Sequence, residues 1–124
     1  MICVDLPYPD KLLWPNGPRG NVFAVSKCKA KHKVWADVAA LAALPVCHPQ
    51  VFAGEALLPV HIAVTGKPGG PLPDRDNVVA SAKVYIDAIS KRIGVNDRRF
   101  SAPTVEFIGR SKTGGFTITI GGAQ

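Results

Sequence analysis

Apolar residues recur along the chain with spacings typical of two helices. Between about Asn21 and Leu44 they return every three or four positions, which predicts a helix terminated by Pro45. A second helix is expected from about Asn77 to Ile93, closed by Gly94, because glycine readily adopts the left-handed conformation that ends helices. The apolar residues that define the first helix are Val22, Val25, Val34, Val38, Leu41 and Leu44.

Shorter runs with alternating or β-branched residues predict strands. Ile2 to Leu6 is the first, and Ala56 to Thr65 is the second, in which Pro59 indicates an edge position or a strand start. Thr104 to Ile108 and Phe116 to Ile120 flank a glycine-containing turn and are expected to form a β-hairpin. Loops are expected at the proline- and glycine-rich segments 7–9, 14–18, 47–55 and 66–71. The pattern predicts an α+β fold with two main helices packed on a mixed β-sheet and a C-terminal hairpin.

Length and composition set the class of protein. The 124 residues suffice for a single domain, expected to span residues 1–124. Hydrophobic residues make up 47% and charged residues 19%, which is typical of a globular domain and not of a disordered chain. The longest apolar run falls far short of the roughly 18 residues that cross a bilayer, and no signal-peptide pattern follows Met1. A soluble cytoplasmic protein without membrane contact is expected.

The charges are distributed unevenly. The formal net charge of +6 suits a polyanionic partner such as nucleic acid. Lys27, Lys29, Lys31 and Lys33 alternate within the first expected helix, where phosphate contact and a simple solvated face explain them equally well. Four of the nine acidic residues lie within one short segment, at Asp74, Asp76, Asp87 and Asp97. A basic chain has thus concentrated its carboxylates in one place.

Asp74 and Asp76 carry the strongest sign of chemistry. In an extended segment, residues i and i+2 project to the same side, so these two carboxylates can hold one divalent cation that relieves their repulsion. The alternative is that Asp76 or Asn77 caps the second helix, where both residue types are preferred. Capping would account for one acid and leave the pair unexplained.

The second helix is expected to carry a charged line on the face away from the core. Asp76, Lys83 and Asp87 fall within about 40° of one another around the helix axis. The Lys83 ammonium can reach a phosphate held beside the two aspartates. For Asp87, a simple surface ion pair with Lys83 explains the spacing equally well. A separate apolar stripe comprises Val79, Ala82, Ile86, Ile89 and Ile93.

The cysteines and histidines give weaker signals. Three cysteines without a C-x-x-C motif argue for a reducing compartment and buried thiols. The Cys28–His32 spacing, followed by Cys47 and His48, would suit two zinc ligands on one helix face, but without paired cysteines no zinc is expected. His61 lies in an expected strand and is interpreted as a solvent-facing or hydrogen-bonded residue.

Three ordered blocks closely resemble the RusA-like family of Holliday junction resolvases of bacteria and their phages. The blocks are D-x-D-N at 74–77, K-x-x-x-D-A at 83–88 and G-V-N-D at 94–97. The resemblance covers roughly Pro73 to Phe100 strongly, with weaker support from the Trp14–Asn16 loop and the lysine-rich helix. It implies a small α+β homodimer, in a bacterial or phage-infected cell, that binds four-way DNA junctions and nicks opposing strands with Mg²⁺, for which Mn²⁺ can substitute.

The resemblance also implies residue roles. Asp74, Asp76 and Asp97 match the catalytic, metal-binding aspartates, and Lys83 matches the catalytic lysine. Two features depart from the bacterial pattern: Lys83 lies about one helical turn farther from D-N, and Asn96 replaces the first aspartate of a usual pair. Both are interpreted as subfamily character. The residues expected to contact DNA are Lys27, Lys29, Lys31, Lys33, Arg75, Arg98 and Arg99.

The length of the second helix raises a geometric question. A straight helix about 25 Å long would keep Asp97, which follows its C-terminal end, far from Asp76 at its N-terminal end in the same chain. Either the helix is broken, or the chain doubles back after Gly94, or an antiparallel twofold partner supplies its own Asp97. All three possibilities are open at this stage.

The expected function is therefore Mg²⁺-dependent resolution of four-way DNA junctions by paired nicks, in recombination, repair or phage DNA processing. Two alternatives from other classes fit the same residues. One is a non-catalytic protein that only binds branched DNA, as a degenerate resolvase would. The other is a structural Ca²⁺ or Mg²⁺ domain unrelated to DNA, which would leave the positive charge unused.

Overall fold

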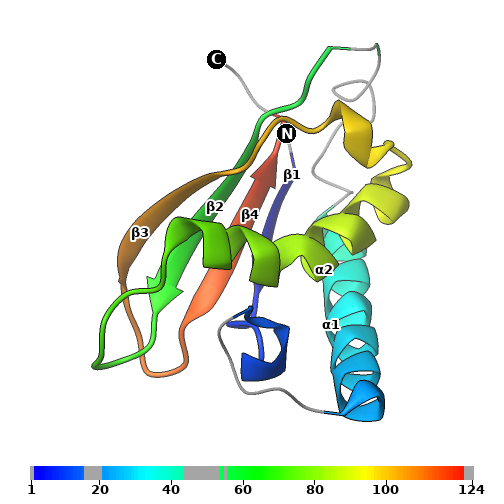
Figure 1. Cartoon of the computed structure of the whole chain (residues 1–124). Helices are drawn as coiled ribbons and strands as arrows, with labels where there is room; N and C mark the ends of the chain where they lie inside the picture. Colours follow the sequence, from blue (N-terminus) through cyan, green and yellow to red (C-terminus); the bar gives the residue numbers. More distant parts are fainter. Residues whose placement is uncertain (1, 16–20, 44–53, 55, 122–124) are drawn as a thin grey trace.

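Two helices cover one face of a four-stranded β-sheet in the computed structural model (Figure 1). The structure describes residues 2–15, 21–43, 54 and 56–121. The elements, in chain order, are β1 (Ile2–Leu6), η1 (Lys11–Leu13), α1 (Val22–Ala43), β2 (Val60–Gly66), α2 (Arg75–Ile93), η4 (Asp97–Arg99), β3 (Thr104–Arg110) and β4 (Gly115–Ile120). The α+β class and the two helices on a mixed sheet are confirmed.

The sheet has the order β1-β4-β2-β3, and this order corrects the expected hairpin. β2 pairs in parallel with β3 and antiparallel with β4, so it lies between the two strands that were expected to pair with each other. The short connection from β3 to β4 passes the end of β2, where the Ser111 amide donates to the Gly66 carbonyl at 2.9 Å. Turn residues indicate that the chain reverses; they do not show that a third strand intervenes.

Alternate residues of three strands form the floor of the core. They are Ile2, Val4, Leu6, Val60, Ile62, Val64, Phe116, Ile118 and Ile120, all buried. β2 begins directly after Pro59, which confirms the strand start but places it later than the expected Ala56. Because β2 is an interior strand, the edge position suggested for Pro59 is wrong.

α1 matches its expected bounds, but its buried face differs from the expected one. Cys28, His32, Ala36 and Ala40 face the core. Of the large apolar residues that defined the pattern, Val22, Val34, Val38 and Leu41 are exposed, and Leu44 lies outside the described residues. Alanines allow α1 to approach its neighbours closely, so the smaller residues are buried and the larger ones face solvent.

α2 begins at Arg75, two residues before the expected start, and ends at Gly94 with φ 71°, as expected. Its most buried residues are Val78, Ala82, Tyr85 and Ile89. The expected apolar stripe was therefore rotated from the true core face, because Val79, Ile86 and Ile93 are only half-buried at its edge. The C-terminal half of α2 meets α1 (Figure 1), where the Arg92 guanidinium forms a bidentate pair with Asp37 at 2.6 and 2.7 Å.

Buried polar groups attach the segment after β1 to both helices. The Tyr85 hydroxyl donates to the Pro7 carbonyl at 2.7 Å, and the Asp10 amide donates to His32 Nε2 at 3.2 Å. The Trp14 ring stacks on Tyr8 with centroids 5.3 Å apart. This anchoring sets the position of the chain as it passes from the sheet to α1.

The cysteine prediction holds only in part. Cys28 is buried, whereas Cys3 is exposed on β1. Cys47, His48 and most of the expected 47–55 loop lie outside the described residues. Within the described part of the chain, no helix is long and apolar enough to cross a membrane.

Candidate functional site

Asp74 and Asp76 lie at the exposed N-terminus of α2. Asp74 is the N-cap residue, with φ −65° and ψ 146°, and Asp76 belongs to the first helical turn. The expected extended D-x-D segment is therefore wrong, and so is the alternative in which Asp76 or Asn77 is the cap. Acidic side chains in the first turn are favoured by the helix dipole, which contributes to α2 stability whatever else they do.

The Asp74 carboxylate is not used for capping. Its side chain accepts no capping hydrogen bond from α2. Asp10 and Asn96, by contrast, cap η1 and η4 by accepting from the amides of Leu12 at 3.0 Å and Arg98 at 2.9 Å. Helix capping therefore gives the Asn96 side chain a structural role, whereas it gives none to the Asp74 carboxylate.

The charged line along α2 forms as expected. Asp76 and Lys83 are exposed and Asp87 is half-buried, all on the side of the helix away from the core. Lys83 Nζ lies 3.6 Å from Asp87 Oδ1. This pair is largely solvated and stabilises the helix by only about 0.3–0.5 kcal/mol.

A hollow of about 320 Å³ lies between this face of α2 and the chain that follows η4. Lys83, Asp87 and Asp97 all line it, beside the apolar side chains of Ile86 and Phe100. α2 is continuous from Arg75 to Ile93, so a broken helix is excluded. The chain instead doubles back after Gly94 and brings Asp97 alongside the middle of the helix.

Asp87 and Asp97 also line a second hollow of about 480 Å³. Lys33 of α1 and Lys91 of α2 contribute to its wall. The two carboxylates therefore lie between lysines of both helices. Such a mixture of acidic and basic groups suits a phosphate diester held beside a cation.

The structure does not bring all of the predicted aspartates together in one chain. Among the described residues, no three His, Cys, Asp or Glu side chains are placed to share a metal ion. Asp97 lies with Lys83 and Asp87, whereas Asp76 lies about 10 Å before Lys83 along the helix axis. Asp74 and Asp76 therefore form one group and Asp87 and Asp97 another.

The predicted DNA-contacting residues differ in their surroundings. Lys27, Lys29, Lys31 and Lys33 are exposed on α1, and Arg98 is exposed in η4. The Arg99 guanidinium donates to the Ala56 carbonyl at 3.1 Å, which gives it a structural role. The remaining residue, Arg75, has its guanidinium 5.9 Å from the ring centroid of Phe107.

His32 and Cys28 do lie together, but their contacts do not suit zinc. His32 Nε2 accepts from the Asp10 amide, and Nδ1 lies 2.9 Å from the Cys28 carbonyl oxygen. Both ring nitrogens are engaged, so the imidazole has no lone pair free for a metal. Burial lowers the pKa of His32, which keeps the ring neutral.

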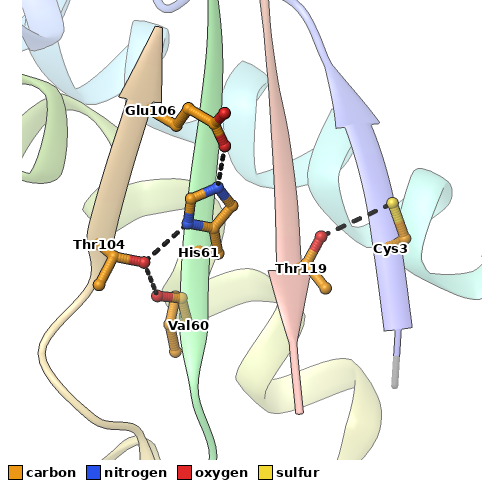
Figure 2. A network of polar contacts seen from close by, with 6 residues as sticks. All are labelled: Cys3, Val60, His61, Thr104, Glu106 and Thr119. Atoms are coloured by element: carbon orange, nitrogen blue, oxygen red, sulfur yellow. Dashed lines mark hydrogen bonds and ion pairs between the residues drawn. The ribbon is translucent and has the colours of Figure 1, made fainter. Parts of the chain in front are cut away.

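A polar network on the open face of the sheet was not foreseen from the sequence. Figure 2 shows His61 between Thr104 and Glu106, with Nδ1 2.7 Å from Thr104 Oγ1 and Nε2 3.1 Å from Glu106 Oε2. This confirms His61 as a hydrogen-bonded strand residue. Its partners lie more than 40 residues away in sequence, so only the parallel pairing of β2 with β3 reveals them.

Comparison with known proteins shows that the chain has a bacterial relative. No protein-family model matches it. It is 36% identical over 113 residues to an uncharacterized protein of Xylella fastidiosa (strain Temecula1 / ATCC 700964), and the alignment covers 86% of this chain and 67% of that protein. The chain belongs to that protein's family. Because that relative is uncharacterized, the evidence on function comes from the site itself.

Proposed function

We propose that this protein is a Mg²⁺-dependent, structure-selective endodeoxyribonuclease that resolves four-way DNA junctions by paired nicks, as RusA-like resolvases do. One observation carries the proposal. Lys83 and Asp87 of α2 line a hollow that Asp97 also lines, and Asp76 continues the same charged face of α2 toward the start of the helix. The proposed setting is DNA recombination, repair or phage DNA processing in the cytoplasm of a bacterial or phage-infected cell.

The donor set fits Mg²⁺. The ion prefers oxygen ligands and is usually held by one or two carboxylates, with water and substrate phosphate completing its shell. Asp74 and Asp76 supply such a pair at the start of α2, and Asp97 supplies a further carboxylate beside Lys83. When bound, Mg²⁺ supplies Lewis-acid activation of water and of the scissile phosphate.

The protein's own side chains have separate tasks in this proposal. The Lys83 ammonium stabilises negative charge that develops on the phosphate, and Asp87, at 3.6 Å, keeps it oriented toward the hollow. The exposed lysines of α1, together with Arg98, hold the DNA backbone through phosphate contacts that are independent of sequence. Arg75 lies next to the aspartates and can contact the same strand.

A homodimer would complete the site. One chain leaves Asp97 apart from Asp74 and Asp76, so a twofold partner that adds its own aspartate to the first pair would assemble three carboxylates. A twofold arrangement gives two equivalent sites, which suits a substrate with near-twofold symmetry that needs two cuts.

The test is nicking of a synthetic four-way junction in Mg²⁺. Asp76→Asn is expected to abolish nicking and to leave junction affinity nearly unchanged, because the substitution removes one metal ligand and no phosphate contact. Asp5→Asn is the matched control: Asp5 is exposed on β1, accepts a hydrogen bond from Thr117, and lines none of the hollows described above, so nicking should be retained. Full nicking by Asp76→Asn would refute the mechanism.

A second candidate is a protein that binds branched DNA without cutting it. It is favoured by the observation that, among the described residues, one chain gathers no three metal-ligating side chains. Wild-type protein that binds the junction, yet leaves it intact in both Mg²⁺ and Mn²⁺, would support this candidate.

A further inference from the structure

The loop between β2 and α2 curls around a single side chain. Arg110, the last residue of β3, directs its guanidinium at three carbonyl oxygens of this loop. Nη1 donates to the carbonyls of Lys67 and Gly69 and Nη2 donates to that of Gly70, each at 2.9 Å. Both glycines have φ 74°, a left-handed conformation that glycine adopts without steric cost, so the backbone can turn around the guanidinium. We call these three hydrogen bonds the Arg110 clasp.

The clasp is anchored on the sheet. Arg110 pairs with Gly66 in the parallel register of β2 and β3, and the Ser111 amide donates to the Gly66 carbonyl at 2.9 Å. On the loop side, a Cβ at Gly66 would lie 3.1 Å from Leu72 Cδ2, so the Leu72 side chain packs closely over the end of β2. The guanidinium therefore extends from two paired strands, and the loop is held against them near both of its ends.

The clasp lies directly before the candidate metal ligands. Three residues, 71–73, of which the first and last are prolines, separate Gly70 from Asp74. Each proline fixes its own φ and restricts the residue before it, so this connection is stiff. The Asp74 side chain accepts no capping hydrogen bond that would hold it by itself, so its placement depends on the backbone that leads to it. A shift of the loop at Gly70 is therefore passed on to the first turn of α2.

We propose that Arg110 is a positioning residue for the Asp74–Asp76 pair, and that the clasp fixes the loop so that both carboxylates are in place before a divalent cation binds. A partner outside the ligand shell acts by orienting the ligands and by reducing the conformational entropy that they lose on binding. A guanidinium suits this task because its rigid fork reaches several carbonyls at once, which a lysine ammonium on a flexible stem does not. In the role that it gives the aspartate pair, the inference rests on the proposed function.

The first test is the affinity for Mn²⁺ without DNA, measured by electron paramagnetic resonance. Arg110→Gln is expected to raise the dissociation constant about tenfold, the lower end for a partner beyond the ligand shell. Arg110→Lys keeps the charge but not the fork, and should recover only part of the affinity. Lys112→Gln is the matched control: Lys112 is exposed two residues farther along, so the variant loses the same charge and should bind Mn²⁺ as wild type does.

Hydrogen exchange of the metal-free protein tests the positioning directly. The Val78 amide donates to the Asp74 carbonyl at 3.0 Å, so its exchange rate reports on the first turn of α2. Arg110→Gln should speed exchange at Val78 severalfold and leave the amide of Gly94, at the other end of α2, unchanged. The thermal unfolding midpoint should stay close to that of wild type, because Arg110 is exposed.

A change of loop shape without a change of charge gives an independent check. Gly69→Ala places a Cβ on a residue with φ 74°, where no neighbouring atom crowds it but the backbone is strained. This variant should also weaken Mn²⁺ binding. Combining it with Arg110→Gln should add little, because both changes act through the same loop. Fully additive losses would show two separate effects and overturn the inference.

The remaining outcomes separate this inference from the proposed function. Unchanged Mn²⁺ affinity in Arg110→Gln would overturn the inference, and so would full recovery by Arg110→Lys, since charge alone would then suffice. An equal loss in Lys112→Gln, faster exchange along the whole of α2, or wild-type protein that binds no Mn²⁺ would overturn it too. Arg110-dependent Mn²⁺ binding by a protein that leaves junctions intact refutes only the nicking. Nicking with the same Mg²⁺ requirement in wild type and Arg110→Gln refutes only this inference.

Discussion

At the scale of single residues, three side chains at helix starts show how similar positions serve different purposes. Asp10, Asp74 and Asn96 are each the N-cap of a helix. Only Asp10 and Asn96 use their side-chain oxygen to cap the helix, because Asp74 makes no such bond. Asparagine caps as well as aspartate does, so an asparagine in place of an aspartate at position 96 preserves the local structure.

His32 makes the folded state sensitive to pH. The buried ring accepts from the Asp10 amide and must be neutral to do so, and its pKa is lowered by burial. The unfolded chain takes up this proton near pH 6.5, whereas the folded chain takes it up only at lower pH. Below about pH 6.5 the unfolded state therefore binds more protons, and stability falls until the folded pKa is reached.

Urea unfolding at pH 7.5 and 5.5 measures this effect. Stability should fall with decreasing pH by up to about 1.4 kcal/mol per unit from this one group. The His32→Gln side chain can still accept from the Asp10 amide, but it does not titrate, so the free energy of unfolding should depend less on pH in this variant. His61→Gln, on the open face of the sheet, serves as the control. Equal slopes for wild type and His32→Gln would show that His32 does not contribute.

At the scale of elements, α1 shows that helical periodicity locates a helix without identifying its inner face. Apolar side chains follow α1 on two sides: small ones toward the core and large ones toward solvent. A hydrophobicity pattern ranks valine and leucine above alanine as core residues. Close packing against α2 and β1 reverses that ranking, because only small side chains fit between elements that approach closely.

This packing predicts an unusual result for a more hydrophobic helix. Ala40→Leu should lower the free energy of unfolding by about 1–3 kcal/mol, because Ala40 is fully buried and a larger side chain overpacks the contact. Ala42→Leu makes the same change at an exposed position of the same helix and should be nearly neutral. Thermal unfolding of both variants, compared with wild type, checks the assignment; a stabilised Ala40→Leu would contradict it.

At the scale of the whole molecule, folding separates lysines that are close in sequence and brings one of them near aspartates that are distant in sequence. Lys33 of α1 lines a hollow with Asp87 and Asp97, although more than 50 residues separate it from either. Lys27 points to another side of α1 and lines a different hollow, near Asp10. The alternating lysines therefore divide between the candidate site and another surface.

Salt dependence of junction binding measures which lysines meet DNA. In the absence of Mg²⁺, Lys33→Ala should reduce the slope of log affinity against log salt by about one, the value for one lost phosphate contact. Lys27→Ala should change it less, because it lies away from the candidate site. Fluorescence anisotropy over a range of salt concentrations gives both slopes. Equal changes of the slope in the Lys33→Ala and Lys27→Ala variants would show that DNA does not bind preferentially on the side of α1 that faces Asp87 and Asp97.

Local patterns in the sequence were sufficient to predict the α+β class, the bounds of α1, the closure of α2 at Gly94 and the charged line on α2. Each of these depends on residues within a few positions of one another, where periodicity, capping and turn chemistry act directly. The D-x-D-N, K-x-x-x-D-A and G-V-N-D blocks were visible for the same reason.

Only the tertiary structure decided how distant segments meet. In the folded chain β2 lies between β3 and β4, and the small side chains of α1 face the core. Asp97 lies near Lys83 beside the middle of α2, whereas Asp74 and Asp76 lie at the N-terminus of that helix. These outcomes depend on close packing and strand pairing between segments tens of residues apart. Such contacts are selected by the shape and free energy of the assembled core, which no local pattern records.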